Sequence, residues 1–452
     1  MANSKELHEL TVTEAARAIR DRKLSAVELM EALLERSRNL ESRLHVWVTL
    51  DEEMALASAR QSQQELERNG PSGPLHGVPV GIKDTFYTKG MKTTFCSPMY
   101  ADHIPDYDAT SVAKLKQAGA IVMGKAVTTQ FACGDPSPTR NPWNTGHTPG
   151  GSSSGSAAGV AAGYFPMALG SQTAGSVLRP ATYNGVVGLK PTLGRMSRHG
   201  VYPNAWSLDT IGTFTRTVED AALLMTIISG LDPNDPTTSP LPVPDYTRSL
   251  NKQTSGPRIG LMRQFFLENA VDETRNHIES VGKQLEKAGA SVRELTVPMN
   301  MDTLQWAHRI VMAVEGAAIH EKDFSDRPGD YAPDVRRWIE MGQLIPAITY
   351  ANAQQVRGKF RRLLREAMDD VDVVLTSTSF SPAPDVSTTG DPRWQAPFTT
   401  AGFPAITLPS GLSKDRLPHG PQLIAKPFVE EQLIAVAAWC ERELNVKLSP
   451  SL

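Results

Sequence analysis

The sequence has few of the residues that redox, metal and nucleotide chemistry require. Its 452 residues include three cysteines, at Cys96, Cys133 and Cys440, which form neither a CxxC pair nor a Cys/His metal spacing. It has no HExxH, no GxxxxGK[ST], and no GxGxxG after a predicted strand, so zinc, phosphate-loop and dinucleotide signals are missing. We therefore expect neither a metal nor a cofactor.

Surplus positive charge and long apolar runs are also missing. The formal net charge is -3, with 40% hydrophobic and 21% charged residues, which is typical of a globular chain that binds neither nucleic acid nor an anionic membrane. There is no run of ~18 apolar residues, and the first ten, MANSKELHEL, lack the apolar centre of a secretory signal. The scarcity of cysteine fits a reducing compartment. We expect a cytoplasmic monomer or homodimer.

The hydrophobic pattern alternates between helical and strand periods along the chain. Two [S/T]-x-x-E capping boxes, beginning at Thr11 and Ser25, predict helix starts. Further helices are predicted at about 51–67, 111–118, 216–229, 272–288, over most of 302–369 and at 430–443. Strands are predicted at about 78–82, 120–123, 186–189, 258–261, 291–298 and 371–376, with two more within 397–428. This interleaving predicts an α/β fold with a largely buried sheet.

One stretch, residues 150–176, is rich in glycine and serine and has no acid, base or thiol. It opens with Gly150 and Gly151, continues with three serines at 152–154, and closes on Gly175 and Ser176. Glycines let a ligand approach the main chain closely. A serine hydroxyl needs a base to become a nucleophile, and no histidine lies between 147 and 199. The base must come from elsewhere in the chain.

Residues 151–155 also match G-x-S-x-G, the nucleophile elbow of α/β-hydrolases, with Ser153 as its nucleophile. That motif requires a strand directly before it. Residues 141–150 carry two prolines and several glycine and asparagine turn signals instead. The elbow interpretation is therefore disfavoured.

A second candidate is Lys83, which ends the short apolar strand that carries Val78, Val80 and Ile82. A lysine in that place can point into the interior. It can equally be a surface lysine paired with the adjacent Asp84. The local pattern leaves both interpretations open.

Together these segments resemble the amidase signature family of serine hydrolases. The motifs that carry the resemblance are NPWNTGHTPGGSSSGSAAGVAAG, ALGSQTAGSVLRPATYNGVVGLKPT and GRMSRHGVYPNAWSLDTIGTFTRTVEDAALL within 141–224, with weaker agreement at LHGVPVGIKD, GKAVTTQFACG and AGFPAITLPSGLS. The resemblance implies a single large α/β domain, with a mixed sheet surrounded by helices. It further implies a core at about 65–230 and 370–452, and a variable cap at about 230–370 that sets specificity.

The resemblance also implies site residues. Its triad falls on Lys83, on Ser152 as the serine that follows a cis peptide bond, and on Ser176 as the nucleophile. It implies a supporting role for Gly151, Ser153 and Ser154, with one of these serines hydrogen-bonded to the lysine. It also implies an oxyanion hole made of the backbone N–H groups of Thr173, Ala174, Gly175 and Ser176. For Lys83 to act as a base it must be neutral, and burial lowers a lysine's pKa. Ser176 would then pass its proton to Ser152, and Ser152 to Lys83.

The sequence departs from the family pattern around the nucleophile. The common DxGGS reads Gln172-Thr173-Ala174-Gly175-Ser176, so a usual carboxylate and one glycine are replaced. Arg179 follows Ser176 by three residues; in one branch of the family a similarly spaced arginine holds a substrate carboxylate. Arg179, Gln130 and Cys133 are the candidates for substrate binding, with a structural role as the alternative for each.

The expected activity is hydrolysis of the C–N bond of a small amide, anilide or carbamate through an acyl-enzyme, with esterase side activity. Two alternatives remain: a glutaminase-like component of an amidotransferase, and an inactive binding protein of the same fold. The stretch 301–320, MDTLQWAHRIVMAVEGAAIH, is expected to be a cap helix that is packed in the core or lines the cleft.

Overall fold

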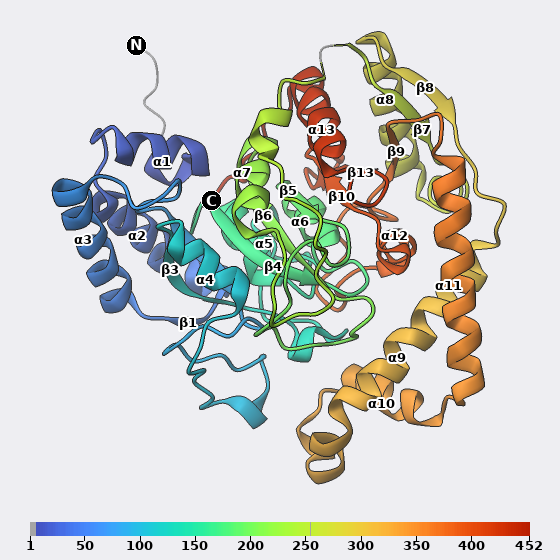
Figure 1. Cartoon of the computed structure of the whole chain (residues 1–452), viewed down its shortest axis with the longest axis horizontal. Coiled ribbons are helices and arrows are strands. Elements are labelled where there is room, and N and C mark those ends of the chain that lie inside the picture. The colour runs from blue at the N-terminus through green and yellow to red at the C-terminus, as the bar shows by residue number, and fades with distance from the viewer. Residues whose placement is uncertain (1–5, 254) are drawn as a thin grey trace.

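The centre of the molecule is an eleven-stranded mixed sheet (Figure 1). The structure is a computed structural model that describes residues 6–253 and 255–452. The first ten residues were predicted to lack a secretory signal, and residues 1–5 of that segment lie outside the described part. The strand order is β1-β3-β2-β4-β6-β5-β10-β13-β9-β7-β8. The strands are β1 (Trp47–Leu50), β2 (Pro79–Lys83), β3 (Ile121–Ala126), β4 (Met167–Gln172), β5 (Val187–Lys190), β6 (Thr210–Thr215), β7 (Arg258–Leu261), β8 (Ser291–Glu294), β9 (Val373–Ser377), β10 (Ala405–Thr407) and β13 (Pro421–Ile424).

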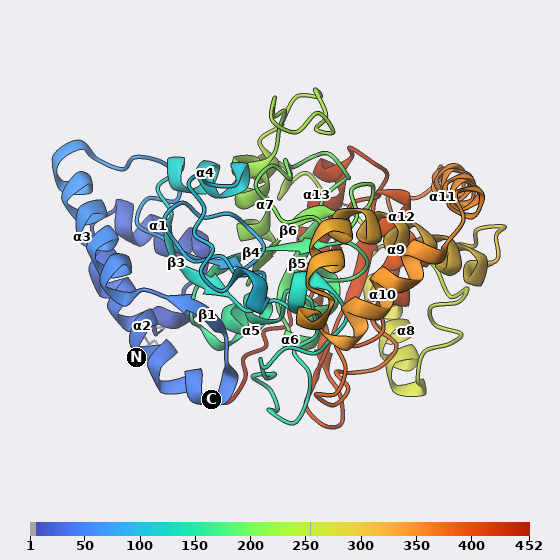
Figure 2. The ribbon, with the colours of Figure 1, turned by 90° about the horizontal axis from the view of Figure 1, so that it is seen from below.

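Helices surround this sheet, and the predicted α/β class is confirmed (Figures 1 and 2). Strand β2 pairs in parallel with β3 and β4, whereas β4 pairs antiparallel with β6, so the sheet is mixed. A separate two-stranded sheet joins β11 (Gly411–Leu412) to β12 (Pro418–His419). The α-helices are α1 (Val12–Arg20), α2 (Ala26–Leu44), α3 (Glu52–Asn69), α4 (Thr110–Gln117), α5 (Ser154–Ala162), α6 (Leu178–Asn184), α7 (Val218–Ile228), α8 (Asp272–Lys287), α9 (Met301–Asp326), α10 (Pro333–Leu344), α11 (Ala347–Ala367), α12 (Ala396–Ala401) and α13 (Glu430–Leu444).

The N-terminal helices begin where their capping boxes predict. The Thr11 hydroxyl accepts a hydrogen bond from the Glu14 amide, and the Ser25 hydroxyl accepts one from the Glu28 amide. Each cap satisfies backbone donors that the first helical turn leaves free. Helix α2 then buries an apolar face that includes Leu33 and Leu34. Helices α1–α3 thus flank the β1 end of the sheet (Figure 1).

Helix α5 and strands β4 and β6, which lie within or next to the serine-rich stretch, were not predicted from the sequence. Helix α5 reads SGSAAGVAA and is buried on almost all sides, so it lacks the polar face that marks an amphipathic helix. Strand β4 reads MALGSQ and strand β6 reads TIGTFT, and neither alternates cleanly between apolar and polar residues. Burial on both faces removes the alternation that reveals a strand in sequence.

The range 230–370, predicted as the cap, divides into two parts. Strands β7 and β8 continue the central sheet at the edge opposite β1. Helices α9, α10 and α11, which we call the helical arm, lie outside the sheet (Figures 1 and 2). The arm packs on the core where Tyr331 and Val335 meet Phe95 and Phe131. Met301 at the start of α9 is buried, whereas Trp306 is 60% exposed, so the predicted cap helix is only partly core. The division into core and cap stays a prediction, with the arm as the candidate cap.

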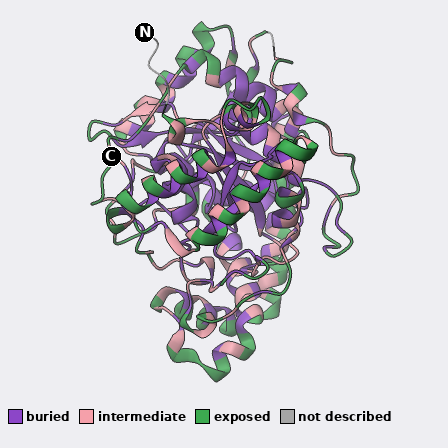
Figure 3. Cartoon of the chain, turned by 90° about the vertical axis from the view of Figure 1, so that its left-hand side faces the viewer, coloured by how far each residue is buried: buried purple, intermediate pink, exposed green. Residues whose placement is uncertain are grey.

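Buried residues are concentrated where the sheet lies, and exposed residues cover the outer helices (Figure 3). Within residues 6–253 and 255–452, no helix combines the length and the apolar character needed to cross a membrane. The apolar interior of the sheet also encloses charged side chains. Two of them, Lys83 and Asp84, are adjacent in sequence and fully buried at the end of β2. Burying a charged group costs free energy unless the group is paired or hydrogen-bonded, so Lys83 and Asp84 require such partners.

Candidate active site

Lys83 is the last residue of β2 and its side chain is entirely buried. Its Nζ donates to Ser152 Oγ at 2.8 Å and to Ser171 Oγ at 2.9 Å. A weaker contact reaches the Ser171 carbonyl at 3.4 Å. Of the two interpretations of this lysine, the structure favours the interior one: it is another buried lysine, Lys125, that lies beside Asp84, at 3.8 Å.

Burial lowers the pKa of Lys83 to about 7, because the apolar interior disfavours the charged ammonium. The negative charge of Asp209 acts in the opposite direction and limits the decrease. A substantial neutral fraction is therefore present near pH 7. A neutral amine 2.8 Å from a serine hydroxyl can accept its proton.

The three consecutive serines occupy the entry to α5. The peptide bond between Gly151 and Ser152 is cis. The Ser154 hydroxyl donates to the Gly150 carbonyl at 2.8 Å, and the Ser153 hydroxyl donates to the Ser171 carbonyl at 3.4 Å. Neither bonds Lys83, so the expectation that Ser153 or Ser154 supports the lysine is replaced by Ser171 on β4. Residues 141–150 contain no strand, and this agrees with the rejection of the elbow motif.

Ser176 lies in the turn between β4 and α6, and 8% of its surface is exposed. Within the described part of the chain, no hydrogen bond joins its hydroxyl to Ser152. The turn is braced from one side by Thr399, whose hydroxyl donates to the Ala174 carbonyl at 2.8 Å. Gln395, one helical turn before Thr399, approaches so closely that a Cβ added to Gly175 would lie 2.1 Å from its Oε1. A side chain at position 175 would therefore displace the Gln395 amide from its present position.

Gln172 takes the place of the family's usual carboxylate and also holds this turn. Its Oε1 accepts hydrogen bonds from the amides of Val177 at 2.9 Å and Leu178 at 3.1 Å. Its Nε2 donates to Thr399 Oγ1 at 2.9 Å. A carboxylate could accept the first two bonds but could not donate the third. Gln172 thus joins the start of α6 to the residue that braces Ala174.

Asp209, which directly precedes β6, supports the same turn. One of its oxygens accepts the Thr173 hydroxyl at 2.6 Å, and the other accepts the amides of Asn204 at 2.7 Å and Ala205 at 2.9 Å. Burial raises the pKa of Asp209, and these bonds oppose that rise. Neither Asp209 nor Ser171 was predicted from the sequence. Both lie within the segments that resemble the family, but no sequence pattern around either residue indicates its role.

Arg179 is on α6, and only 4% of its surface is exposed. Its Nη2 donates to the Gly151 carbonyl at 2.6 Å and reaches Thr389 Oγ1 at 3.5 Å. Its Nε and Nη1 are buried without a hydrogen-bond partner among the described residues. Burial lowers the pKa of this guanidinium, which stays charged at neutral pH. Arg179 therefore anchors the carbonyl that precedes Ser152 and keeps two nitrogens, Nε and Nη1, without a partner among the described residues.

The other two substrate-binding candidates make structural contacts. Gln130 donates to the Asp330 carbonyl at 2.7 Å and accepts from the Ala332 amide at 2.6 Å, which ties the core to the helical arm. Cys133 is buried and its Sγ accepts from Asn204 Nδ2 at 3.6 Å. These contacts engage the Gln130 amide and place Cys133 in the wall between core and arm. No group of three or more His, Cys, Asp or Glu residues able to hold a metal occurs in the described ranges.

The family and the solved relatives of this chain show that it is a hydrolase that acts on carbon–nitrogen bonds. The chain belongs to the amidase signature family: the family model for Amidase matches residues 28–434. It is 38% identical to the A component of the glutamyl-tRNA(Gln) amidotransferase from Carboxydothermus hydrogenoformans, over 96% of each chain. Among solved structures, it resembles native peptide amidase from Stenotrophomonas maltophilia (29% identity, TM-score 0.87, 98% of each chain) and 6-aminohexanoate cyclic dimer hydrolase (25%, 0.87, 98% of each).

Proposed function

We propose that the protein is an amidase that hydrolyses a small amide, anilide or carbamate through an acyl-enzyme on Ser176. The observation that carries this proposal is the hydrogen bond between Ser152 and Lys83, whose pKa burial lowers to about 7. A lysine that is partly neutral near pH 7 supplies the base that a serine nucleophile requires. The family and its solved relatives, a peptide amidase and a cyclic dimer hydrolase, support the reaction class.

In the proposed reaction the Ser176 oxygen attacks the substrate carbonyl carbon. The Ser176 proton passes to Ser152 while the Ser152 proton passes to neutral Lys83. The carbonyl oxygen becomes an oxyanion bound by the backbone N–H groups of residues 173–176; one such donor is typically worth ~2.7–4 kcal/mol in the transition state. The relay then runs backwards, protonates the amine as the C–N bond breaks, and leaves an ester on Ser176. Water attacks this ester with the same groups as base, and the acid is released.

We propose that Ser171 is the positioning residue for Lys83, in the place first given to Ser153 and Ser154. Its hydroxyl lies 2.9 Å from Nζ and so gives the lysine a second partner besides Ser152. Gly151, with its carbonyl held by Arg179, positions Ser152 in turn. Nε and Nη1 of Arg179, which have no partner among the described residues, support a further role in holding a negatively charged or carbonyl oxygen of the substrate.

A second candidate function is the glutaminase-like component of an amidotransferase, which would release ammonia from glutamine for a partner. The specific observation in its favour is the identity of 35–38% to the A components of glutamyl-tRNA(Gln) amidotransferases over at least 95% of this chain. The inactive-binding-protein alternative is disfavoured because the groups of the proposed relay are all present.

The deciding experiment measures amine or ammonia release by the purified chain alone. The panel contains aliphatic amides, anilides, carbamates and glutamine. Turnover of amides other than glutamine, lost in Ser176→Ala, supports the amidase. Glutamine turnover that appears only after the other components of an amidotransferase are added supports the second function. No turnover under either condition would contradict both.

A further inference from the structure

A cavity of about 230 Å³ adjoins the candidate site on the side of β6. It shares two residues with the site: Ser171, the partner of Lys83, and Thr173, which begins the proposed oxyanion turn. Its remaining wall comes from residue 132, from the segment 198–211 that leads into β6, and from residues 234–235. A substrate held by residues 173–176 would therefore have this space beside it.

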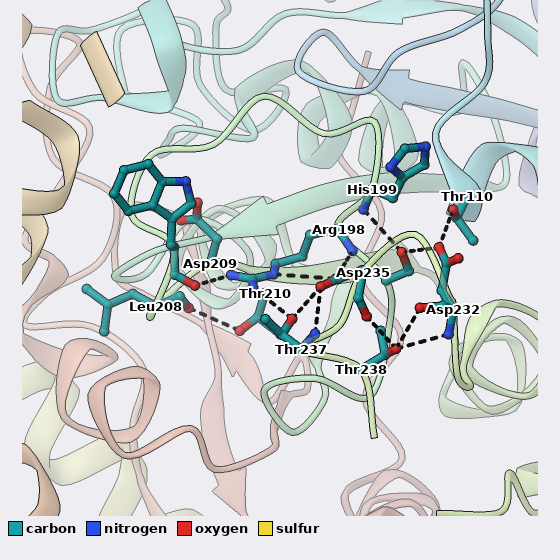
Figure 4. A network of polar contacts seen from close by, with 12 residues as sticks. Thr110, Arg198, His199, Leu208, Asp209, Thr210, Asp232, Asp235, Thr237 and Thr238 are labelled. Carbon is teal, nitrogen blue, oxygen red and sulfur yellow. Dashed lines mark hydrogen bonds and ion pairs between the residues drawn. The ribbon is translucent and has the colours of Figure 1, made fainter. Parts of the chain in front are cut away.

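The charged groups around the cavity already have partners within the protein. The Arg198 guanidinium donates to the Trp206 carbonyl and, at 2.8 Å, to Thr237 Oγ1, and its Nε lies 3.7 Å from Asp235 (Figure 4). Asp235 also accepts from the amides of Arg198 and Thr237. Asp209 accepts three hydrogen bonds, as described above. Among the described residues, a charged substrate group would find no unpaired opposite charge here.

Other polar groups in the wall are engaged in the same way. Both the amide and the side chain of Asn234 bond Asp232, and the ring of His199 stacks on Tyr107 with centroids 5.3 Å apart. The neighbouring Asp232 is bonded to Thr110, which ties this loop to α4 (Figure 4). The loops that frame the cavity are thus joined to one another and to α4 by hydrogen bonds.

The surface left for a ligand is apolar and partly aromatic. It includes Val201, Pro203, Trp206 and Ile211. The ring of Tyr202, whose residue also lines the cavity, already packs against Phe95 and Phe131. Trp206 is 51% exposed, so its side chain is accessible to a ligand in the cavity. A dry apolar cavity of ~150 Å³ holds a benzene molecule, so 230 Å³ accommodates one substituted ring.

We propose that this cavity binds a neutral aromatic ring of the substrate, packed against Trp206. This inference rests on the proposed function, whose substrate class it narrows to aryl amides or anilides. A ring in this position would gain the aromatic contact and the burial of its apolar surface, whereas a zwitterionic substrate such as glutamine would gain neither. The ring can belong to the acyl side or to the amine side, and the test measures both.

The test compares kcat/KM for benzamide, with its ring on the acyl side, and acetanilide, with its ring on the amine side, each relative to acetamide. The variants are Trp206→Ala, Trp206→Phe and the matched control Trp306→Ala, which removes an exposed tryptophan from the helical arm. We expect Trp206→Ala to lower at least one aryl-to-acetamide ratio about tenfold, an amount that loss of an aromatic contact and its buried area supplies. Trp206→Phe should retain most of the ratio, and Trp306→Ala should leave it unchanged.

Equal ratios in the wild type and a folded Trp206→Ala, for both aryl substrates, would overturn the proposal. If the wild type turns over none of these three amides, the kinetic ratios cannot be measured, and the cavity is tested by calorimetric titration of benzamide and acetanilide; the proposed function is decided separately by the full substrate panel. In the Ser176→Ala background, binding of either compound that weakens about tenfold on adding Trp206→Ala supports the cavity assignment. Absence of binding at millimolar ligand, or binding that Trp206→Ala leaves unaltered, overturns it.

Discussion

The pH dependence of amide hydrolysis should report the titration of Lys83. Only the neutral amine can take a proton from Ser152, and burial lowers the pKa of Lys83 from 10.5 to about 7. Protonation removes the base, so kcat/KM should fall as the pH is lowered through 7. Above that pH nearly all of the enzyme carries the neutral lysine, and the profile should level off.

The expected size of the effect follows from that pKa. With a pKa of about 7, roughly one tenth of the lysine is neutral at pH 6 and roughly nine tenths at pH 8, which predicts an increase of about tenfold. Between about pH 8 and 9.5 the profile should be nearly flat. An ordinary lysine would instead give an increase of about tenfold per pH unit over the whole range, with no plateau.

The assay is a pH–rate profile of kcat/KM on a matched amide and activated ester, for the wild type, Lys83→Ala and Lys83→Arg. Arginine stays protonated, so Lys83→Arg should lose amide hydrolysis as fully as Lys83→Ala, by about 10²–10⁴-fold. The amide should suffer more than the ester, because a poor amine leaving group needs the returned proton. Near-normal amide turnover in Lys83→Arg, or an unchanged rising limb in Lys83→Ala, would refute the reasoning.

Three further outcomes are expected. Lys83→Met should raise the free energy of unfolding at pH 7 by about 2 kcal/mol, measured by denaturant titration. Burying a lysine whose pKa is lowered to about 7 costs ~4 kcal/mol, which exceeds the stabilisation lost with its two short hydrogen bonds. The wild type should gain stability between about pH 7 and 10, where the unfolded lysine binds the additional proton, and this gain should be absent from the variant. Gly175→Ala should lower kcat at least about tenfold, because its methyl group displaces Gln395. The control Gly358→Ala, with nothing within 4 Å of its added methyl, should leave kcat unchanged. Equal kcat values for the two variants would contradict the assignment of residues 173–176 as the oxyanion hole. Chelators should leave activity unchanged, and a loss that zinc restores would contradict metal independence.

Helix boundaries with local signals could be predicted from the sequence. The capping boxes at Thr11 and Ser25 place α1 and α2 correctly, and the strand at 258–261 is found as predicted. In each case the information lies within a few residues. Strands β4 and β6 and helix α5 were missed because their burial on all sides leaves no polar face to read.

For the candidate site, the sequence names residues but not the contacts between them, and the roles of those residues stay predictions. Lys83, Ser152 and Ser176 follow from the motifs, whereas the contact between Lys83 and Ser171 depends on how β2 and β4 pair. Their parallel register sets Ile82 opposite Leu169, so that Lys83 and Ser171 lie near the ends of neighbouring strands at the same edge. That register depends on contacts between segments far apart in the chain. The same holds for Gln130, whose amide meets the helical arm 200 residues away.

The central claim is that Ser176 is the nucleophile. The most direct measurement treats the purified chain with a fluorophosphonate, digests it and locates the adduct by tandem mass spectrometry. We expect one adduct, on Ser176, whose formation slows in Lys83→Ala because the relay no longer removes the Ser176 proton. An adduct on Ser153, or labelling that persists in Ser176→Ala, would contradict the claim.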